Sequence, residues 1–120
     1  MNEVRLQIEN LESFIDRSME MAKRLDAGER TSGDSHISFE TMEGLLKVLT
    51  PNRWVLLRTL RGRGPSSIRA LARDLDRDYR GVHADVAMLV EAGLVERDRK
   101  GAVSVPWSRI TAEMALDAAA

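Results

Sequence analysis

Between residues 51 and 93 the sequence carries three short aliphatic stripes at helical spacing, and turn-forming residues separate them. An apolar face that recurs every three or four residues predicts an amphipathic helix, so each stripe predicts one helix. In chain order the stripes are Trp54, Leu57 and Leu60, then Ile68, Leu71, Ala72 and Leu75, then Val82, Val86, Leu89 and Val90. The breaks between them, Gly62–Pro65 and Asp76–Asp78, are short, so the helices must follow one another through tight turns.

The residues that border these stripes predict where each helix begins and ends. Thr50 is a good N-cap for the first helix, and Ser66 or Ser67 is one for the second. Asp78 can cap the third helix, and Gly93 is placed to end it as the glycine that follows the last turn. We therefore expect a helix, a short helix, a tight turn and a longer helix in direct succession.

Strand patterns lie on both sides of this helical segment. Downstream, the predicted strands Val95–Arg97 and Val103–Val105 flank a turn at residues 99–101, which indicates a β-hairpin. Upstream, residues 3–8 alternate polar and apolar side chains, which predicts a short strand. Residues 108–116 fit a helix or a strand, because their apolar side chains satisfy either period.

Two further amphipathic helices are predicted in the first half of the chain. One covers residues 11–25 with Asn10 as its N-cap, and the other covers residues 42–49. The polar, turn-rich segment from Gly28 to Ser35 between them predicts a loop.

Together these elements predict an α+β fold that is mainly helical and has a small β-hairpin. Residues 1–35 form an N-terminal strand, amphipathic helix and loop, residues 36–107 the main domain, and residues 108–120 a C-terminal tail. A chain of 120 residues is long enough for one domain with one appendage.

Charge is distributed unevenly along the chain, although the net charge is only −1. Residues 51–83 hold 8 arginines and 3 aspartates, a local net charge of +5. Residues 1–50 carry a net charge of −4 and residues 84–120 a net charge of −2. Because local fields govern recognition more than the total does, the basic middle segment favours a polyanionic partner.

The predicted order of elements is that of a winged helix-turn-helix, in which the third helix enters the major groove of double-stranded DNA. With its apolar stripe turned inward, that helix presents Arg80 outward, where its fork suits a guanine edge. The serines at the start of the second helix suit a phosphate, and so do the basic residues of the hairpin. The candidate DNA-binding residues are Ser66, Ser67, Arg69, Arg77, Tyr79, Arg80, His83, Ala84, Arg97, Arg99 and Lys100.

The N-terminal helix has two open interpretations. A single helix-turn-helix buries too little surface for tight specific binding, so a homodimer is expected, and this helix is the candidate dimer arm. The candidate dimer or partner residues are Leu11, Phe14, Ile15, Met21 and Leu25. The alternative is that this helix packs on its own domain. An acidic N-terminal third would also suit a basic protein partner, such as a toxin.

Enzymatic and metal-dependent functions are disfavoured by composition and spacing. Cysteine is absent, which excludes disulfides, thiolate metal sites and cysteine nucleophiles. The two histidines lie 47 positions apart and no glycine-rich phosphate loop is present. Asp74, Asp76 and Asp78 alternate but lack the glycine and distal glutamate of a calcium loop. We expect no catalytic residues, no metal, no cofactor, no signal peptide, no membrane span and a cytoplasmic location.

Residues 37–107 resemble the winged helix-turn-helix predicted transcriptional regulators of the MarR-like class, within their small prokaryotic, antitoxin-like group. The segments that carry the resemblance are Ile37–Glu40, Leu49–Trp54, Ser67–Ala72, Arg77–Tyr79, Val82–Val86 and Glu91–Glu96. Two residues depart from the pattern. Asp76 stands where the turn usually holds glycine, although aspartate tolerates the left-handed conformation. Gly81 lies inside the third helix, where glycine costs roughly 1 kcal/mol relative to alanine.

The resemblance implies a homodimeric, sequence-specific DNA-binding repressor that acts by occluding its operator. The alternatives are a protein–protein module that uses the winged-helix fold, or an antitoxin that binds a toxin and regulates its own synthesis.

Overall fold

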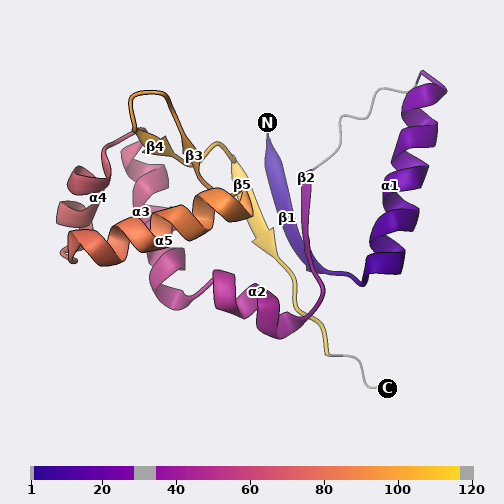
Figure 1. Ribbon diagram of the computed structural model, residues 1–120, viewed down its shortest axis with the longest axis horizontal. Coiled ribbons are helices and arrows are strands. Elements are labelled where there is room, and N and C mark those ends of the chain that lie inside the picture. Colours follow the sequence, from indigo (N-terminus) through magenta and orange to yellow (C-terminus); the bar gives the residue numbers. More distant parts are fainter. Residues whose placement is uncertain (1, 29–34, 117–120) are drawn as a thin grey trace. The chain divides into compact units, whose positions relative to one another are not determined.

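The computed structural model describes residues 2–28 and 35–116, which form helices and short strands of an α+β fold (Figure 1). The elements are β1 Glu3–Ile8, α1 Leu11–Asp26, β2 Ser35–Phe39, α2 Met42–Val48, α3 Pro51–Arg63, α4 Ile68–Leu75, α5 Tyr79–Ala92, β3 Glu96–Arg97, β4 Val103–Ser104 and β5 Arg109–Ala112. The chain divides into two compact units, residues 1–45 with 108–120, and residues 46–107. Residues 29–34, which make up most of the predicted loop, and residues 117–120 lie outside the described residues.

The first unit contains a three-stranded parallel sheet in the order β2-β1-β5. The predicted strand at residues 3–8 is confirmed as β1, whose side chains Val4 and Leu6 are fully buried. The ambiguous segment 108–116 contains a strand, because β5 pairs with β1 in the register Val4 to Ile110. The strand β2, which was not predicted, pairs with β1 and belongs to the first unit, whereas the second unit begins at Leu46.

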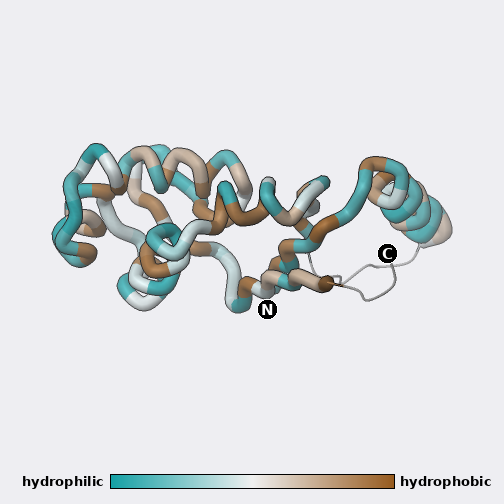
Figure 2. Tube along the Cα trace, turned by 90° about the horizontal axis from the view of Figure 1, so that it is seen from below, coloured by the Kyte–Doolittle hydropathy of each residue, from teal (hydrophilic) through white to brown (hydrophobic). Residues whose placement is uncertain are grey.

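Helix α1 is confirmed close to its predicted bounds, and Asn10 caps it by accepting a hydrogen bond from the backbone N–H of Ser13 at 2.7 Å. None of its residues is buried among the described residues. Its turns carry both hydrophilic and hydrophobic positions (Figure 2). The apolar side chains are exposed, with Phe14 at 42% and Leu11 at 61%. The contact between α1 and the strand ends is polar, since the Arg17 guanidinium lies 3.2 Å from the Glu9 carboxylate.

The second unit is built from α3, α4, α5 and the hairpin β3–β4. The Thr50 hydroxyl accepts from the N–H of Arg53 at 3.3 Å and caps α3, and Pro51 takes the first helical position, where its missing N–H costs nothing. The core of the second unit consists of buried apolar side chains from the three helices and the hairpin region. They are Leu56, Leu57, Leu60, Ile68, Leu71, Ala72, Val82, Val86, Leu89, Leu94, Val95 and Val103.

Several sequence expectations about the second unit differ from the structure. Leu75 was placed on the buried stripe of α4, but it is only half-buried. Trp54 was placed on the buried stripe of α3, but it is 41% exposed, and Leu56 is buried in its stead. Val90 is only half-buried. Asp78 precedes α5 as predicted, yet its side chain makes no capping hydrogen bond.

No helix among the described residues is long and apolar enough to cross a membrane.

Candidate nucleic-acid interface

Helices α4 and α5 are joined by the tight turn that the sequence predicted. Ser67 caps α4, because its hydroxyl accepts from the N–H of Ala70 at 3.1 Å. Helix α4 ends at Leu75, and the C-cap residue Asp76 adopts the left-handed conformation with φ 51° and ψ 49°. Its N–H donates to carbonyls in the last turn of α4, so the chain reverses before α5 begins at Tyr79. Asp76 therefore adopts the left-handed conformation for which glycine is usual in this turn.

One face of α5 is buried and the opposite face is open to solvent. Val82, Val86 and Leu89 pack into the core of the second unit. The candidate residues Arg80, His83 and Ala84 are exposed, as predicted from the apolar stripe. Within the described part of the chain, the guanidinium of Arg80 has no hydrogen bond or ion pair. This charged group is therefore free to meet a ligand.

Tyr79 lies between two other candidate residues at the start of α5. The guanidinium carbon of Arg69, on α4, lies 4.9 Å from the centroid of the Tyr79 ring, which is a cation–π contact. The rings of Tyr79 and His83 are 5.8 Å apart and tilted by 43°. The structure thus brings Arg69, Tyr79 and His83 from two helices into one exposed row.

The two serines at the start of α4 have different environments. Ser67 is exposed and caps the helix. Ser66 is only 8% exposed, and its backbone exchanges hydrogen bonds with Val103 in β4, at 3.0 and 2.8 Å. Burial removes Ser66 from the predicted set of contact residues, since its side chain does not reach the surface.

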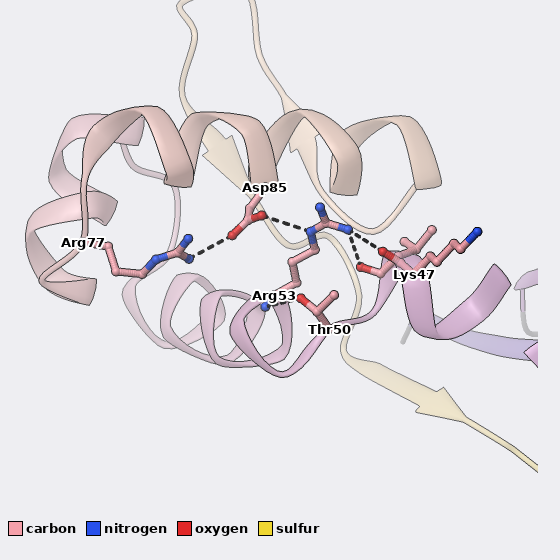
Figure 3. A network of polar contacts seen from close by, with 6 residues as sticks. Lys47, Thr50, Arg53, Arg77 and Asp85 are labelled. Atoms are coloured by element: carbon pink, nitrogen blue, oxygen red, sulfur yellow. Dashed lines mark hydrogen bonds and ion pairs between the residues drawn. The ribbon is translucent and has the colours of Figure 1, made fainter. Parts of the chain in front are cut away.

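Arg77, which was expected to face a ligand, is held by a polar network that sequence reasoning missed (Figure 3). Its Nη1 donates to Asp85 Oδ2 at 2.9 Å. The other carboxylate oxygen accepts from Arg53 Nε at 3.1 Å. Arg53 Nη1 also donates to the carbonyls of Lys47 and Val48, at 2.8 and 3.0 Å. One carboxylate therefore joins two arginines, and α3 is linked to α5 and to the end of α2.

A sequence signal for this network existed. Asp85 follows Val82 by three residues and precedes Val86, so it borders the buried stripe of α5. A carboxylate in that position needs a charged partner. The partners come from 8 and 32 residues away, and the spacing within α5 does not reveal which arginines they are.

Gly81 is explained by the same network. A Cβ atom at this position would lie 3.3 Å from Nη2 of Arg77. The absent side chain leaves room for the Arg77 guanidinium to cross the first turn of α5 on its way to Asp85.

The hairpin presents the remaining predicted cations. Arg97, Arg99 and Lys100 are all exposed. The Asp98 carboxylate accepts from the N–H of Lys100 at 2.8 Å and orders the turn, which Gly101 completes with φ 86°.

A shallow hollow of about 510 Å³ lies beside the α4–α5 turn, and we refer to it as the arginine hollow. Its lining residues are Arg69, Ala72, Arg73, Asp76, Arg77 and Tyr79. Three arginines and one aspartate give this lining a net charge of +2.

No cluster of three or more potential metal ligands occurs among the described residues.

The second unit is thus an α+β unit in which Arg80 of α5, the arginine hollow beside the α4–α5 turn and the tip of the hairpin each present basic side chains. The family model HVO_A0114 matches residues 48–112, more than half of the sequence, and the chain belongs to that family. No curated protein and no solved structure matches the chain.

Proposed function

We propose that this protein is a sequence-specific DNA-binding transcriptional regulator and that its second unit is a winged helix-turn-helix. The order of α3, α4, a tight turn, α5 and a hairpin supports this interpretation. The bridge between Ser66 and Val103 adds to that support, because it ties the segment between α3 and α4 to the hairpin.

The exposed and unpaired Arg80 is the observation that carries the proposal. It lies in the first turn of a helix whose opposite face is buried, where a side chain meets base edges once the helix enters a major groove. Its fork matches guanine O6 and N7. Arg97, Arg99 and Lys100 of the hairpin contact phosphates and position the protein without reading sequence.

The proposal includes a homodimer that occupies two half-sites and represses transcription by blocking polymerase. Exposed apolar side chains on α1 support it, because a helix whose apolar face is unburied needs a partner. These side chains are Leu11, Phe14, Ile15, Met19 and Leu25, and Met21 beside them is half-buried.

Fluorescence anisotropy tests the DNA-binding proposal directly. The probe is the DNA upstream of the protein's own coding sequence, with a scrambled duplex of equal length as control. We expect tighter binding to the upstream duplex, and affinity that falls steeply between about 50 and about 200 mM salt. If neither duplex is bound at the lower salt concentration, the proposal is wrong.

A second candidate function is that of a protein-binding module, including an antitoxin that holds a basic toxin. The exposed apolar stripe of α1 in a segment of net negative charge favours it. Affinity purification distinguishes the two functions, because only this one predicts a stoichiometric basic partner that dissociates when Phe14 is replaced by Glu.

A further inference from the structure

Arg77 belongs to two sites at once. It donates to Asp85 in the network with Arg53, and its side chain also lines the arginine hollow. Its side chain is 28% exposed, whereas the side chains of Arg53 and Asp85 are 15% and 14% exposed. Arg77 is therefore the outermost member of the network and the one that a ligand in the hollow can reach.

Asp85 does not need both of its arginines to remain neutralised. A half-buried carboxylate that loses its single partner is strongly destabilised, because its charge is left poorly solvated. Here Arg53 stays bonded to the carboxylate at 3.1 Å if Arg77 departs, and the carbonyls of Lys47 and Val48 hold Arg53 in place. The network can thus release Arg77 without leaving an unpaired charge.

We propose that the arginine hollow binds one phosphate of a DNA backbone, and that Arg77 exchanges its bond to Asp85 for a bond to that phosphate. The inference rests on the proposed DNA-binding function and specifies a contact that it does not include. The strength of the bond to Asp85 then determines how readily Arg77 binds the phosphate. Arg53 makes the exchange possible, because it keeps the Asp85 carboxylate paired when Arg77 leaves.

The chemistry of the lining suits a phosphate. Arg73 has no partner in the described part of the chain, and the Tyr79 ring orients the guanidinium of Arg69. Arginine forks match phosphate oxygens in pairs and form short, charge-assisted hydrogen bonds. Tyr79 lines the hollow and also begins the exposed face of α5, so a backbone that follows α5 passes the hollow.

The salt dependence of DNA binding tests the exchange. Each phosphate contact contributes about 0.9 to the slope of log K against log salt, or about 3.5-fold in affinity between about 50 and about 200 mM salt. We expect Arg77→Gln to lower the magnitude of this slope by about 0.9, the value of one phosphate contact, on specific and scrambled duplexes alike. Arg5→Gln, which removes an equal charge from β1 in the first unit, is the control for net charge and should keep the wild-type slope.

Asp85→Asn gives the opposite expectation and separates exchange from simple bracing. Because the amide holds Arg77 less tightly, we expect several-fold tighter DNA binding with the slope retained. Glu40→Gln, at an exposed residue of the first unit, controls for the loss of one negative charge. If Asp85 is only a brace, Asp85→Asn weakens binding instead, and that result overturns the proposal.

Arg53→Gln provides a further check, because Asp85 then depends on Arg77 alone. We expect this variant, verified as folded by circular dichroism, to reduce the slope of log K against log salt by the same amount as Arg77→Gln does. The double variant Arg53→Gln with Arg77→Gln should show no further reduction of that slope. An unchanged slope in Arg77→Gln, beside normal wild-type DNA binding, overturns the exchange but leaves the DNA-binding function standing. Absence of wild-type binding refutes the function itself.

A thermal-shift series with inorganic phosphate, matched in ionic strength with chloride, distinguishes the source of the phosphate. No stabilisation specific to phosphate is expected, because a free ion lacks the further contacts that a DNA backbone makes with α5 and the hairpin. Stabilisation that Arg77→Gln abolishes, together with an unchanged DNA slope, would assign the hollow to a free phosphate and overturn the backbone assignment.

Discussion

Replacing Gly81 with alanine sets two effects against each other within the first turn of α5. Alanine favours the helix over glycine by about 0.5–1 kcal/mol, mainly because it restricts the unfolded chain. Against this, the new Cβ would lie 3.3 Å from Nη2 of Arg77, so the guanidinium must move by a few tenths of an ångström.

The structure indicates which effect is larger. The contacted atom is the end of a long, flexible side chain, and Asp85 keeps its bond to Arg53 if the contact with Arg77 weakens. A partly exposed ion pair of this kind contributes about 0.2–1 kcal/mol, of which a small shift removes only a part. We expect Gly81→Ala to raise the free energy of unfolding by about 0.5 kcal/mol.

Urea denaturation followed by tryptophan fluorescence measures this change in the relevant part of the molecule. Both tryptophans, Trp54 and Trp107, belong to the second unit, so the signal reports the unfolding of that unit. Gly62→Ala is the matched control, because Gly62 lies in a terminal turn of α3 and a Cβ there would meet nothing within 4 Å. The difference between the two variants isolates the displacement of Arg77. If Gly81→Ala is less stable than Gly62→Ala by more than about 1 kcal/mol, the guanidinium cannot yield as we infer.

Three further predictions address the cap, the dimer and the DNA contacts. Thr50→Ala removes the hydroxyl that caps α3 and should lower the free energy of unfolding by about 1 kcal/mol, measured by the same urea titration. Phe14→Glu places a charge on the exposed stripe of α1 and should convert a dimer to a monomer in size-exclusion chromatography with light scattering; a wild type that is already monomeric would contradict the dimer. Arg80→Ala should reduce the affinity ratio between specific and scrambled duplexes, whereas Arg99→Ala with Lys100→Ala should weaken binding to both, as anisotropy will show; an unchanged ratio in Arg80→Ala would refute the placement of α5.

Local signals were enough to predict most of the second unit from its sequence. The caps at Thr50 and Ser67, the left-handed residue Asp76 and the glycine after α5 all act within a few residues of where they stand. The apolar period likewise predicted the exposed face of α5. Trp54 was predicted to be buried because it shares a helical stripe with Leu57 and Leu60. Leu56 also lies at helical spacing from Leu60, and only the tertiary packing decides that Leu56 is buried and Trp54 is exposed.

Most other features that escaped prediction depend on partners outside the local sequence pattern. The strand Ser35–Phe39 is specified by its pairing with β1, because its own pattern is too short to decide. The bond between Arg53 and Asp85 spans 32 residues. The bond that pairs Arg77 with the same carboxylate spans 8 residues, which is also beyond the reach of a local pattern. The burial of Ser66 follows from its pairing with Val103. Local patterns thus located the candidate interface, but they did not show which of its charges are occupied.

The pairing of β1 with β5 has a consequence for how the chain is made. Residues 3–6 pair with residues 109–112, and the whole second unit lies between them in the sequence. During synthesis the second unit is complete once residue 107 has left the ribosome, so it can fold before the last strand of the sheet emerges. The sheet of the first unit must wait for its last strand. A nascent chain therefore displays a folded second unit while the edge of β1 that pairs with β5 still carries unpaired backbone N–H and C=O groups, and such an open edge can pair with a strand of another chain.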